Sequence, residues 1–323
     1  NRRGICKRME VEKFVINEQP YACWDFELKK KNLDFLGGID SKYYKFIAEL
    51  IDDNLNDENK QELSILLRVS YSQGLETLFA LLCSLVQAPN CSIGWLLKYK
   101  NHQLKEVVRK ITIGEKVLSR FKINPLSWEL LAKVVHNNLD LEEKKKEKIM
   151  DGFSKLWKHW AHEFIDNNVE MEYNCIKHGF RVKPGGFAIS FELEKEPGIS
   201  PPPEKMNFLP GSEYGSSFFI IENFSKGNKV NFHLKRFSRN WGMKTLKNHL
   251  FIIFLSINNI ICYLKIINGV SPKECQFFYP NSEEGFKEFW EDNIVVKSMC
   301  VDSVFSYNNI TPISEKDIRN SYE

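Results

Sequence analysis

The side chains best suited to chemistry gather in the stretch NCIKH, residues 174–178. His178 carries an imidazole, the side chain most often used as a general acid or base, so this residue could move a proton. Asn174, Lys177 and the nearby Arg181 would supply hydrogen-bond donors around an anion. Because cations also stabilise a helix C-terminus, Lys177 and His178 have a purely structural explanation as partners of the helix dipole. The pattern leaves both explanations open.

These residues would stand at the end of a long helix, or a kinked pair of helices, that ends at Lys177–Gly179. On a helical wheel, residues 153–178 have an apolar face and a face of acids, imidazoles and an amide. Such a polar face is typical of a solvated helix with i,i+4 charge pairs. Because no HExxH motif and no further ligand is evident, we predict no metal and no other cofactor. The weak candidates for metal ligands are His159, His162, Glu163 and Asp166.

A second candidate is Glu76, which lies in the apolar run 62–88. An unpaired buried carboxylate is costly, so a cationic partner is expected if this helix is central. The candidates for this partner are Lys177, His178 and Arg68. The resulting group would be either a structural network or an active site.

A basic and aromatic segment, residues 233–249, is the best candidate for nucleic-acid binding. Aromatic rings beside cations suit single strands, since bases stack on the rings and phosphates pair with the cations. The plain alternative is a charged hairpin end followed by the start of a helix. The predicted nucleic-acid contacts are Arg181, Lys235, Arg236, Arg239, Trp241 and Lys244.

The composition indicates a folded protein with reduced thiols. Of the 323 residues 43% are hydrophobic, which is typical of a folded protein. The net charge of +3 is too small to indicate binding to a nucleic acid or a membrane, so such a partner would have to bind a local charged patch. The eight cysteines form no CxxC pair, and several lie in apolar runs. The basic amino terminus lacks the apolar run of a signal peptide. We therefore predict a cytoplasmic location.

One segment, residues 250–267, has the length of a membrane span. Ser256, Asn258 and Asn259 lie in its middle, where polar side chains are costly in lipid. We predict a buried core helix and no membrane partner; the alternative is a membrane anchor.

The pattern predicts a mainly α protein, α+β overall, in which a helical bundle carries a small β-hairpin or antiparallel sheet. A loosely structured lead-in, residues 1–40, would precede a helical domain, residues 41–179. Alternating apolar residues and Pro/Gly-rich turns predict a β-rich insertion at 180–239. A long core helix at 240–270 would complete the helical domain, before a mixed segment at 271–323.

A helix end with Asn, Lys and His, paired with an acid on an earlier buried helix, resembles the HEPN superfamily. Its members are small helical bundles, many of them RNases of toxin and phage-defence systems that often act as dimers. Their motif has an Arg and a polar residue before the His, whereas this chain has Asn174 in the earlier place and a shorter gap to His178. The resemblance would span residues 41–180 and 240–268.

The resemblance implies a metal-independent endoribonuclease acting on single-stranded RNA, with a homodimer as a further expectation. His178 would be the general acid/base, Asn174 its polar partner and Glu76 the orienting acid, while Lys177 would stabilise the phosphate in place of the arginine. The alternative is a non-catalytic interaction or sensor module, in which the same residues form a buried structural network.

Overall fold

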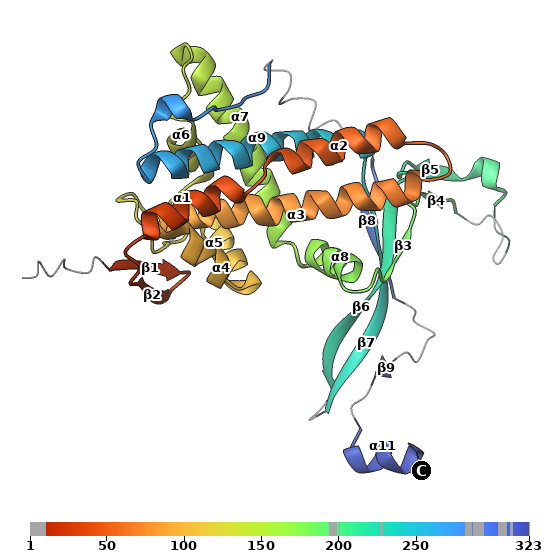
Figure 1. Ribbon diagram of the computed structural model, residues 1–323. Coiled ribbons are helices and arrows are strands. Elements are labelled where there is room, and N and C mark those ends of the chain that lie inside the picture. Colours follow the sequence, from red (N-terminus) through yellow and green to blue (C-terminus); the bar gives the residue numbers. More distant parts are fainter. Residues whose placement is uncertain are drawn as a thin grey trace, which may run out of the picture. The chain divides into compact units, whose positions relative to one another are not determined.

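The computed structural model describes most of the chain, namely residues 11–193, 199, 201–226, 229–281, 286, 294–302, 309–310 and 313–322. Helices dominate and the sheets are small and antiparallel, so the predicted mainly α fold with a β component is confirmed (Figure 1). The chain forms two compact units, each assembled from three stretches of sequence. Unit 1 contains residues 1–54, 70–170 and 247–291, and unit 2 contains residues 55–69, 171–246 and 292–323.

Unit 1 consists of helices and one β-hairpin. The hairpin pairs β1 (Glu12–Ile16) with β2 (Gln19–Cys23). The helices are α1 (Leu28–Gly38), α2 (Lys42–Asn54), α3 (Lys60–Gln87) from residue 70 onward, α4 (Ser92–Lys98), α5 (Asn101–Ile113), α6 (Trp128–His136), α7 (Glu143–Ile165), the first turn of α8 (Asn167–Lys177) and α9 (Met243–Ile267) from residue 247 onward. Short 3₁₀ turns cover Pro89–Cys91 and Pro272–Glu274.

The first part of unit 1 corrects the prediction of a loosely structured lead-in. Phe14 and Ile16 alternate into the core, with 7% and 0% of their surface exposed, and α1 buries Leu36 completely. Asn17, with φ of 55°, forms the left-handed position of the two-residue turn between the strands. Two apolar residues spaced by two were the signal for this strand, and so short a signal is easily overlooked among charged neighbours.

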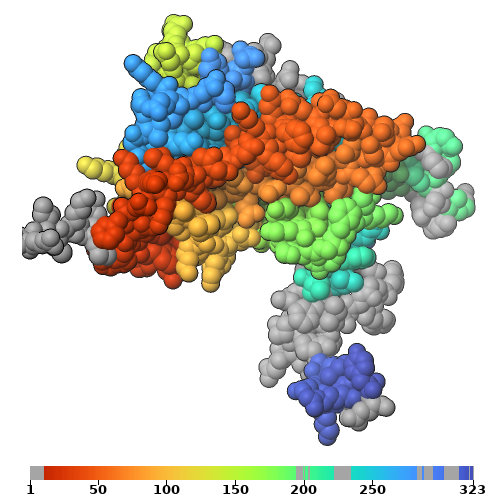
Figure 2. All heavy atoms as spheres, viewed as in Figure 1, coloured from red at the N-terminus to blue at the C-terminus, as the bar shows by residue number. Residues whose placement is uncertain are grey.

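Three helices of unit 1, α2, α3 and α9, pack closely around Gly74. A Cβ at this position would lie 3.0 Å from Ile253 Cγ2 and 3.3 Å from the Tyr44 ring, so a glycine permits the close approach. The Tyr44 hydroxyl completes the contact through a hydrogen bond with Thr77 Oγ1 at 2.8 Å. From Gly74 onward α3 belongs to the same unit as α2, and both helices are orange in Figure 1 and Figure 2.

Among the described residues, α3 and α9 are long and apolar enough to cross a membrane by length and composition alone. In their most apolar windows, 78% of α3 and 67% of α9 is buried within the protein, as in core helices. The asparagines of α9 bind the segment that follows it. Asn258 donates to the Gln276 carbonyl at 2.7 Å, and the Asn259 amide exchanges two hydrogen bonds, at 2.6 and 2.8 Å, with the backbone of Phe278.

The predicted long helix before residue 180 is a kinked pair. α7 ends at Ile165, and the Asp166 carboxylate accepts the N–H of Asn168 at 2.8 Å as α8 begins. The predicted apolar face of α7 is buried, since Phe153, Trp157 and Trp160 have no exposed surface. These rings form much of the aromatic core of unit 1.

Within the described residues, unit 2 is built around a five-stranded antiparallel sheet in the order β3-β6-β7-β8, with β9 also paired to β7. The strands are β3 (Val182–Pro184), β6 (Gly215–Lys226), β7 (Lys229–Asn240), β8 (Ser298–Asp302) and β9 (Asn309–Ile310). A second small sheet pairs β4 (Ile189–Phe191) with β5 (Asn207–Leu209), and a 3₁₀ turn covers Pro203–Lys205. The remaining elements are α3 up to residue 69, α8 from residue 171, the first turn of α9 and α11 (Glu315–Tyr322).

One face of this sheet is buried beneath α8. Phe218, Ile220 and Phe237 form its core, and Cys175 of α8 packs against them. Burial raises the pKa of the Cys175 thiol, so this thiol stays protonated and is a poor nucleophile. β8 and β9 come from the C-terminal part of the chain, so the sheet extends beyond the predicted insertion at 180–239.

Candidate nucleic-acid interface

The helix that carries the predicted catalytic residues ends where the sequence indicated. α8 ends at Lys177, and Gly179, with φ of 105°, adopts a left-handed conformation beyond it. The N–H of Phe180 donates to the Ile176 carbonyl at 3.1 Å, which satisfies one of the last helical acceptors. This closing turn leads directly into β3.

The three candidates on this helix end do not form a buried network. Lys177 and His178 are exposed, and Asn174 is half-buried. The Lys177 ammonium lies 5.5 Å from the centre of the Tyr173 ring, in a cation–π contact. The His178 side chain makes no hydrogen bond or ion pair to any residue that the structure describes. The imidazole is therefore accessible to a ligand, and no described group orients it.

Glu76, the predicted orienting acid, belongs to unit 1 and is half-buried on α3. Its carboxylate accepts a hydrogen bond from the Tyr99 hydroxyl at 3.3 Å. Tyr99 was not among the predicted partners. The candidate Arg68 is engaged in unit 2 instead, in an ion pair described below.

The four weak metal candidates have other environments. His159 and His162 are exposed, Glu163 accepts a hydrogen bond from the Tyr71 hydroxyl at 2.7 Å, and Asp166 binds the first turn of α8. Among the described residues, no group of three or more His, Cys, Asp or Glu side chains is arranged to hold a metal ion.

Unit 2 contains a buried ion pair that the sequence did not reveal. The Glu172 side chain is 1% exposed, and its Oε2 accepts hydrogen bonds from Arg68 Nε at 3.1 Å and Nη2 at 2.9 Å. Its Oε1 accepts the Ser216 hydroxyl at 2.7 Å, and Arg239 Nε lies 3.6 Å from Oε2. The Arg68 guanidinium also stands 5.5 Å from the centre of the Trp241 ring. This network joins α3, α8 and two strands within the unit.

Glu172 was missed because the helical phase changes at Asp166. Carried across that break, the wheel of α7 assigns Met171 to the apolar side, yet Met171 is 36% exposed. Within α8 the buried positions are Val169, Glu172 and Ile176, which share one face at spacings of three and four. The sequence signal for a buried acid was the position of Glu172 between Val169 and Ile176, two apolar residues on the same face of α8.

The sheet corrects the predicted basic and aromatic surface. Because alternate residues of a strand point to opposite faces, Lys235, Phe237 and Arg239 share the face beneath α8. Arg239 approaches Glu172, and Trp241 is only 5% exposed, so neither presents a free surface for stacking. Arg236 alone among the β7 candidates lies on the opposite face, and it is exposed. The other two candidates, Arg181 and Lys244, are exposed and lie outside the strands.

The opposite face of the sheet, which we call the open face, carries exposed apolar side chains. Along β6, Phe218 and Ile220 are buried, whereas Phe219 and Ile221 between and beyond them are 62% and 51% exposed. Phe219 lies directly opposite Arg236 in the β6–β7 register. An aromatic ring and a guanidinium thus form a cross-strand pair on an accessible surface.

A hollow of about 300 Å³ indents this open face. Lys183, Ser217 and Ser238 lie in one row across β3, β6 and β7, and Arg236 lies two residues before Ser238 on the same face. The two serine hydroxyls are 2.7 Å apart, and Met299 and Val301 of β8 complete the apolar side of the hollow. Among the residues that the structure describes, its lining therefore contains two cations and no carboxylate.

The turn at the rim of this hollow has a structural role. The N–H groups of Gly185 and Gly186 donate to the carbonyls of Gly215 and Glu213, at 2.9 and 3.0 Å, so they are not free to cradle a phosphate. A side chain at Gly186 would collide with the Ser212 carbonyl oxygen. The glycines hold the turn, and the ligand donors of the hollow are its side chains.

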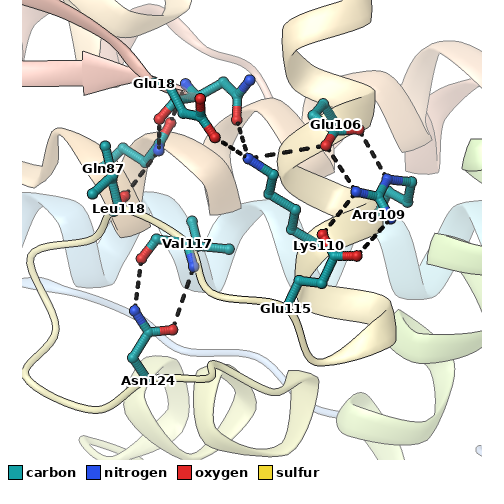
Figure 3. Close-up of polar contacts among 10 residues, drawn as sticks. Glu18, Gln87, Glu106, Arg109, Lys110, Glu115, Val117, Leu118 and Asn124 are labelled. Carbon is teal, nitrogen blue, oxygen red and sulfur yellow. Dashed lines mark hydrogen bonds and ion pairs between the residues drawn. The ribbon is translucent and has the colours of Figure 1, made fainter.

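A larger hollow, of about 570 Å³, lies in unit 1 between the β1–β2 hairpin and the loop after α5. Its main polar group, the Gln87 amide, is fully used: it donates to the carbonyls of Asn17 and Leu118, both at 2.9 Å, and accepts the N–H of Asn17 at 2.8 Å (Figure 3). Arg120 is paired with Glu12 at 2.7 Å. This hollow offers a ligand few unused polar groups.

The charged side chains near this hollow are also paired with one another. Figure 3 shows Lys110 close to Glu18, at 2.6 Å, and to Glu106. Arg109 bridges Glu106 and Glu115, both at 2.8 Å. These partly exposed pairs connect α5 to its surroundings and are of the kind that contributes little individually.

No family model matches the chain, and neither does any curated protein or any solved structure.

Proposed function

We propose that the protein binds single-stranded RNA on the open face of the unit 2 sheet. The observation that carries this proposal is the exposed pair Phe219 and Arg236, placed directly opposite each other by the strand register. Bases splayed from a single strand stack on exposed aromatic side chains, and guanidinium groups add cation–π and phosphate contacts. The net charge of +3 is small, so this local surface provides the attraction.

RNA, rather than DNA, follows from the resemblance of residues 174–178 to the HEPN helix end. On this proposal the protein is a HEPN-like, RNA-directed protein of the cytoplasm, of the toxin or phage-defence type, and a homodimer is its expected assembly. A non-catalytic binding module is favoured over a nuclease, because no described side chain orients the His178 imidazole.

The test is fluorescence anisotropy with a labelled oligouridylate. We expect Phe219→Ala to weaken binding by about 1–3 kcal/mol, the usual contribution of one stacked base. Phe208→Ala is the matched control, since Phe208 is 65% exposed on the other small sheet of unit 2. Equal losses in both variants, or none, would contradict the proposal. If an oligothymidylate, a DNA strand, binds with the same affinity as the oligouridylate, the protein binds single strands without a preference for RNA.

Metal-independent cleavage is the second candidate function, and the accessibility of His178 favours it. The RNA 2′-OH would attack the adjacent phosphate, forming a 2′,3′-cyclic phosphate and breaking the bond from phosphorus to the 5′ oxygen of the next nucleotide. The imidazole would take the proton of the 2′-OH and return it to that leaving 5′ oxygen. Cleavage of the oligouridylate in the presence of EDTA, lost in His178→Ala at an unchanged thermal midpoint, would establish this activity. If the wild type leaves the strand uncleaved, the nuclease is refuted and the non-catalytic binding module is the remaining proposal.

A further inference from the structure

We infer that the hollow of the open face is a phosphate-binding subsite, in which Lys183 and Arg236 hold a backbone phosphodiester of the bound strand. The inference rests on the proposed function and specifies how that surface grips its ligand. It assigns to the hollow a role distinct from base stacking on Phe219.

The charges of the hollow support this assignment. Lys183 and Arg236 are both exposed, and neither forms an ion pair with any residue that the structure describes. Lys183 is on β3 and Arg236 is on β7, so the two cations approach the hollow from strands on either side of β6. Two cations that face a concave surface, with no carboxylate among its described lining residues, favour an anion there.

The hydroxyl pair adds a directed donor. Ser217 Oγ and Ser238 Oγ are 2.7 Å apart, so one hydroxyl donates to the other and the second keeps its proton for a ligand. Ser238 is 5% exposed, so packing fixes its position. A phosphate oxygen bound here would receive a neutral hydrogen bond in addition to the two charged ones.

The location of the hollow suits a strand rather than a free anion. Phe219 and Arg236 face each other, and Arg236 also lines the hollow, so the stacking ring and the phosphate donors are adjacent. Along a single strand each base is followed by a phosphate, which matches the neighbouring positions of the Phe219 ring and the cations of the hollow. A strand could therefore place a base on Phe219 and an adjoining phosphate between Arg236 and Lys183.

The experiment measures the salt dependence of oligouridylate binding by the wild type, Lys183→Gln and Arg236→Gln. Each phosphate contact contributes to the slope of log K against log salt, so we expect each variant to lower the slope by roughly 0.7–1. We also expect about a tenfold loss of affinity per variant, the size of one charged hydrogen bond. Lys205→Gln is the control, because Lys205 is an exposed cation of unit 2 outside the hollow. All variants must retain the wild-type thermal midpoint.

A second ligand series separates the sources of the phosphate. It uses an oligouridylate with neutral methylphosphonate links, uridine monophosphate and inorganic phosphate. The inference predicts that the neutral strand binds the wild type and Lys183→Gln equally, because Lys183 is assigned a phosphate contact alone. If both variants keep the wild-type slope while Phe219→Ala loses binding, strand binding stands and the phosphate subsite falls. If only uridine monophosphate or inorganic phosphate binds, and Arg236→Gln abolishes it, the strand proposal falls and the hollow is a site for a free phosphate compound. Binding of none of these ligands overturns both.

Discussion

Replacing Glu172 by Gln tests whether the buried ion pair holds unit 2 together. The substitution preserves shape but removes the negative charge that faces Arg68 at 2.9 Å and Arg239 at 3.6 Å. The Arg68 side chain is 3% exposed, so water cannot replace the lost acceptor. Removing one partner of a buried pair typically costs 3–5 kcal/mol. The Ser216 hydroxyl keeps an acceptor only if the new amide directs its oxygen toward it, so we expect a loss of about 3 kcal/mol or more.

The assay is urea unfolding followed by circular dichroism, together with hydrogen exchange of the β6 and β7 amides. Exchange distinguishes loss of unit 2 from loss of the whole fold, since each unit could unfold separately. Glu170→Gln is the matched control from the same helix. Glu170 pairs with Lys105 at 2.6 Å, but the two side chains are 33% and 18% exposed, so its loss should cost about 1 kcal/mol or less.

A double variant, Glu172→Gln with Arg68→Met, separates the charge effect from packing. Removing both charges should recover part of the loss, because the apolar replacement removes the buried positive charge that Glu172 had balanced. The reasoning would be refuted if Glu172→Gln cost no more than Glu170→Gln. It would also be refuted if the double variant were destabilised by the sum of the two single losses.

Two other perturbations follow from buried polar groups. Burial lowers the pKa of His136 from its ordinary value of 6.5 to about 4, so between these values only the unfolded chain takes up a proton. The free energy of unfolding is therefore lost as pH falls through this interval, by up to about 3 kcal/mol. In His136→Phe the free energy of unfolding, measured with urea, should depend less on pH over this interval. An unchanged pH dependence in this variant contradicts the assignment to His136. Asn259→Leu leaves the backbone N–H and carbonyl of Phe278 without their partners, at a cost of about 2–4 kcal/mol, and should accelerate exchange of the Phe278 amide. Slow exchange in that variant would show that other contacts hold the segment.

The helical part of the fold was predictable because its signals are local and repeated. Apolar residues at helical spacing identified the buried face of α7, and the uniformly apolar run before Pro89 identified α3 as a core helix. The asparagines of α9 predict a core helix, but their partners at Gln276 and Phe278 lie outside any helical period. A local sequence pattern predicts that such a residue is buried, but it does not predict which group forms its hydrogen bonds.

The site was less predictable because it depends on phase and register. A helical wheel gives the correct face only while the helix continues. Because the helix breaks at Asp166, the wheel of α7 does not predict that Glu172 is buried in unit 2. The partners of Glu172 are 104 and 44 residues away in sequence, at Arg68 and Ser216, so no local spacing joins them.

The open face shows the same dependence in a sheet. Residues 233–249 are basic and aromatic in composition, but strand alternation divides residues 234–240 between two faces of the sheet. Of the predicted contacts on β7, only Arg236 lies on the open face, opposite the exposed ring of Phe219. Lys183, which the sequence did not single out, reaches the same hollow because β3 pairs with β6 through Val182 and Phe218. A shift of one residue in either pairing would exchange the cations for buried side chains. The register of β3, β6 and β7 is therefore what makes this surface a candidate binding site, and the two serines and two cations of its hollow are the residues whose replacement tests it.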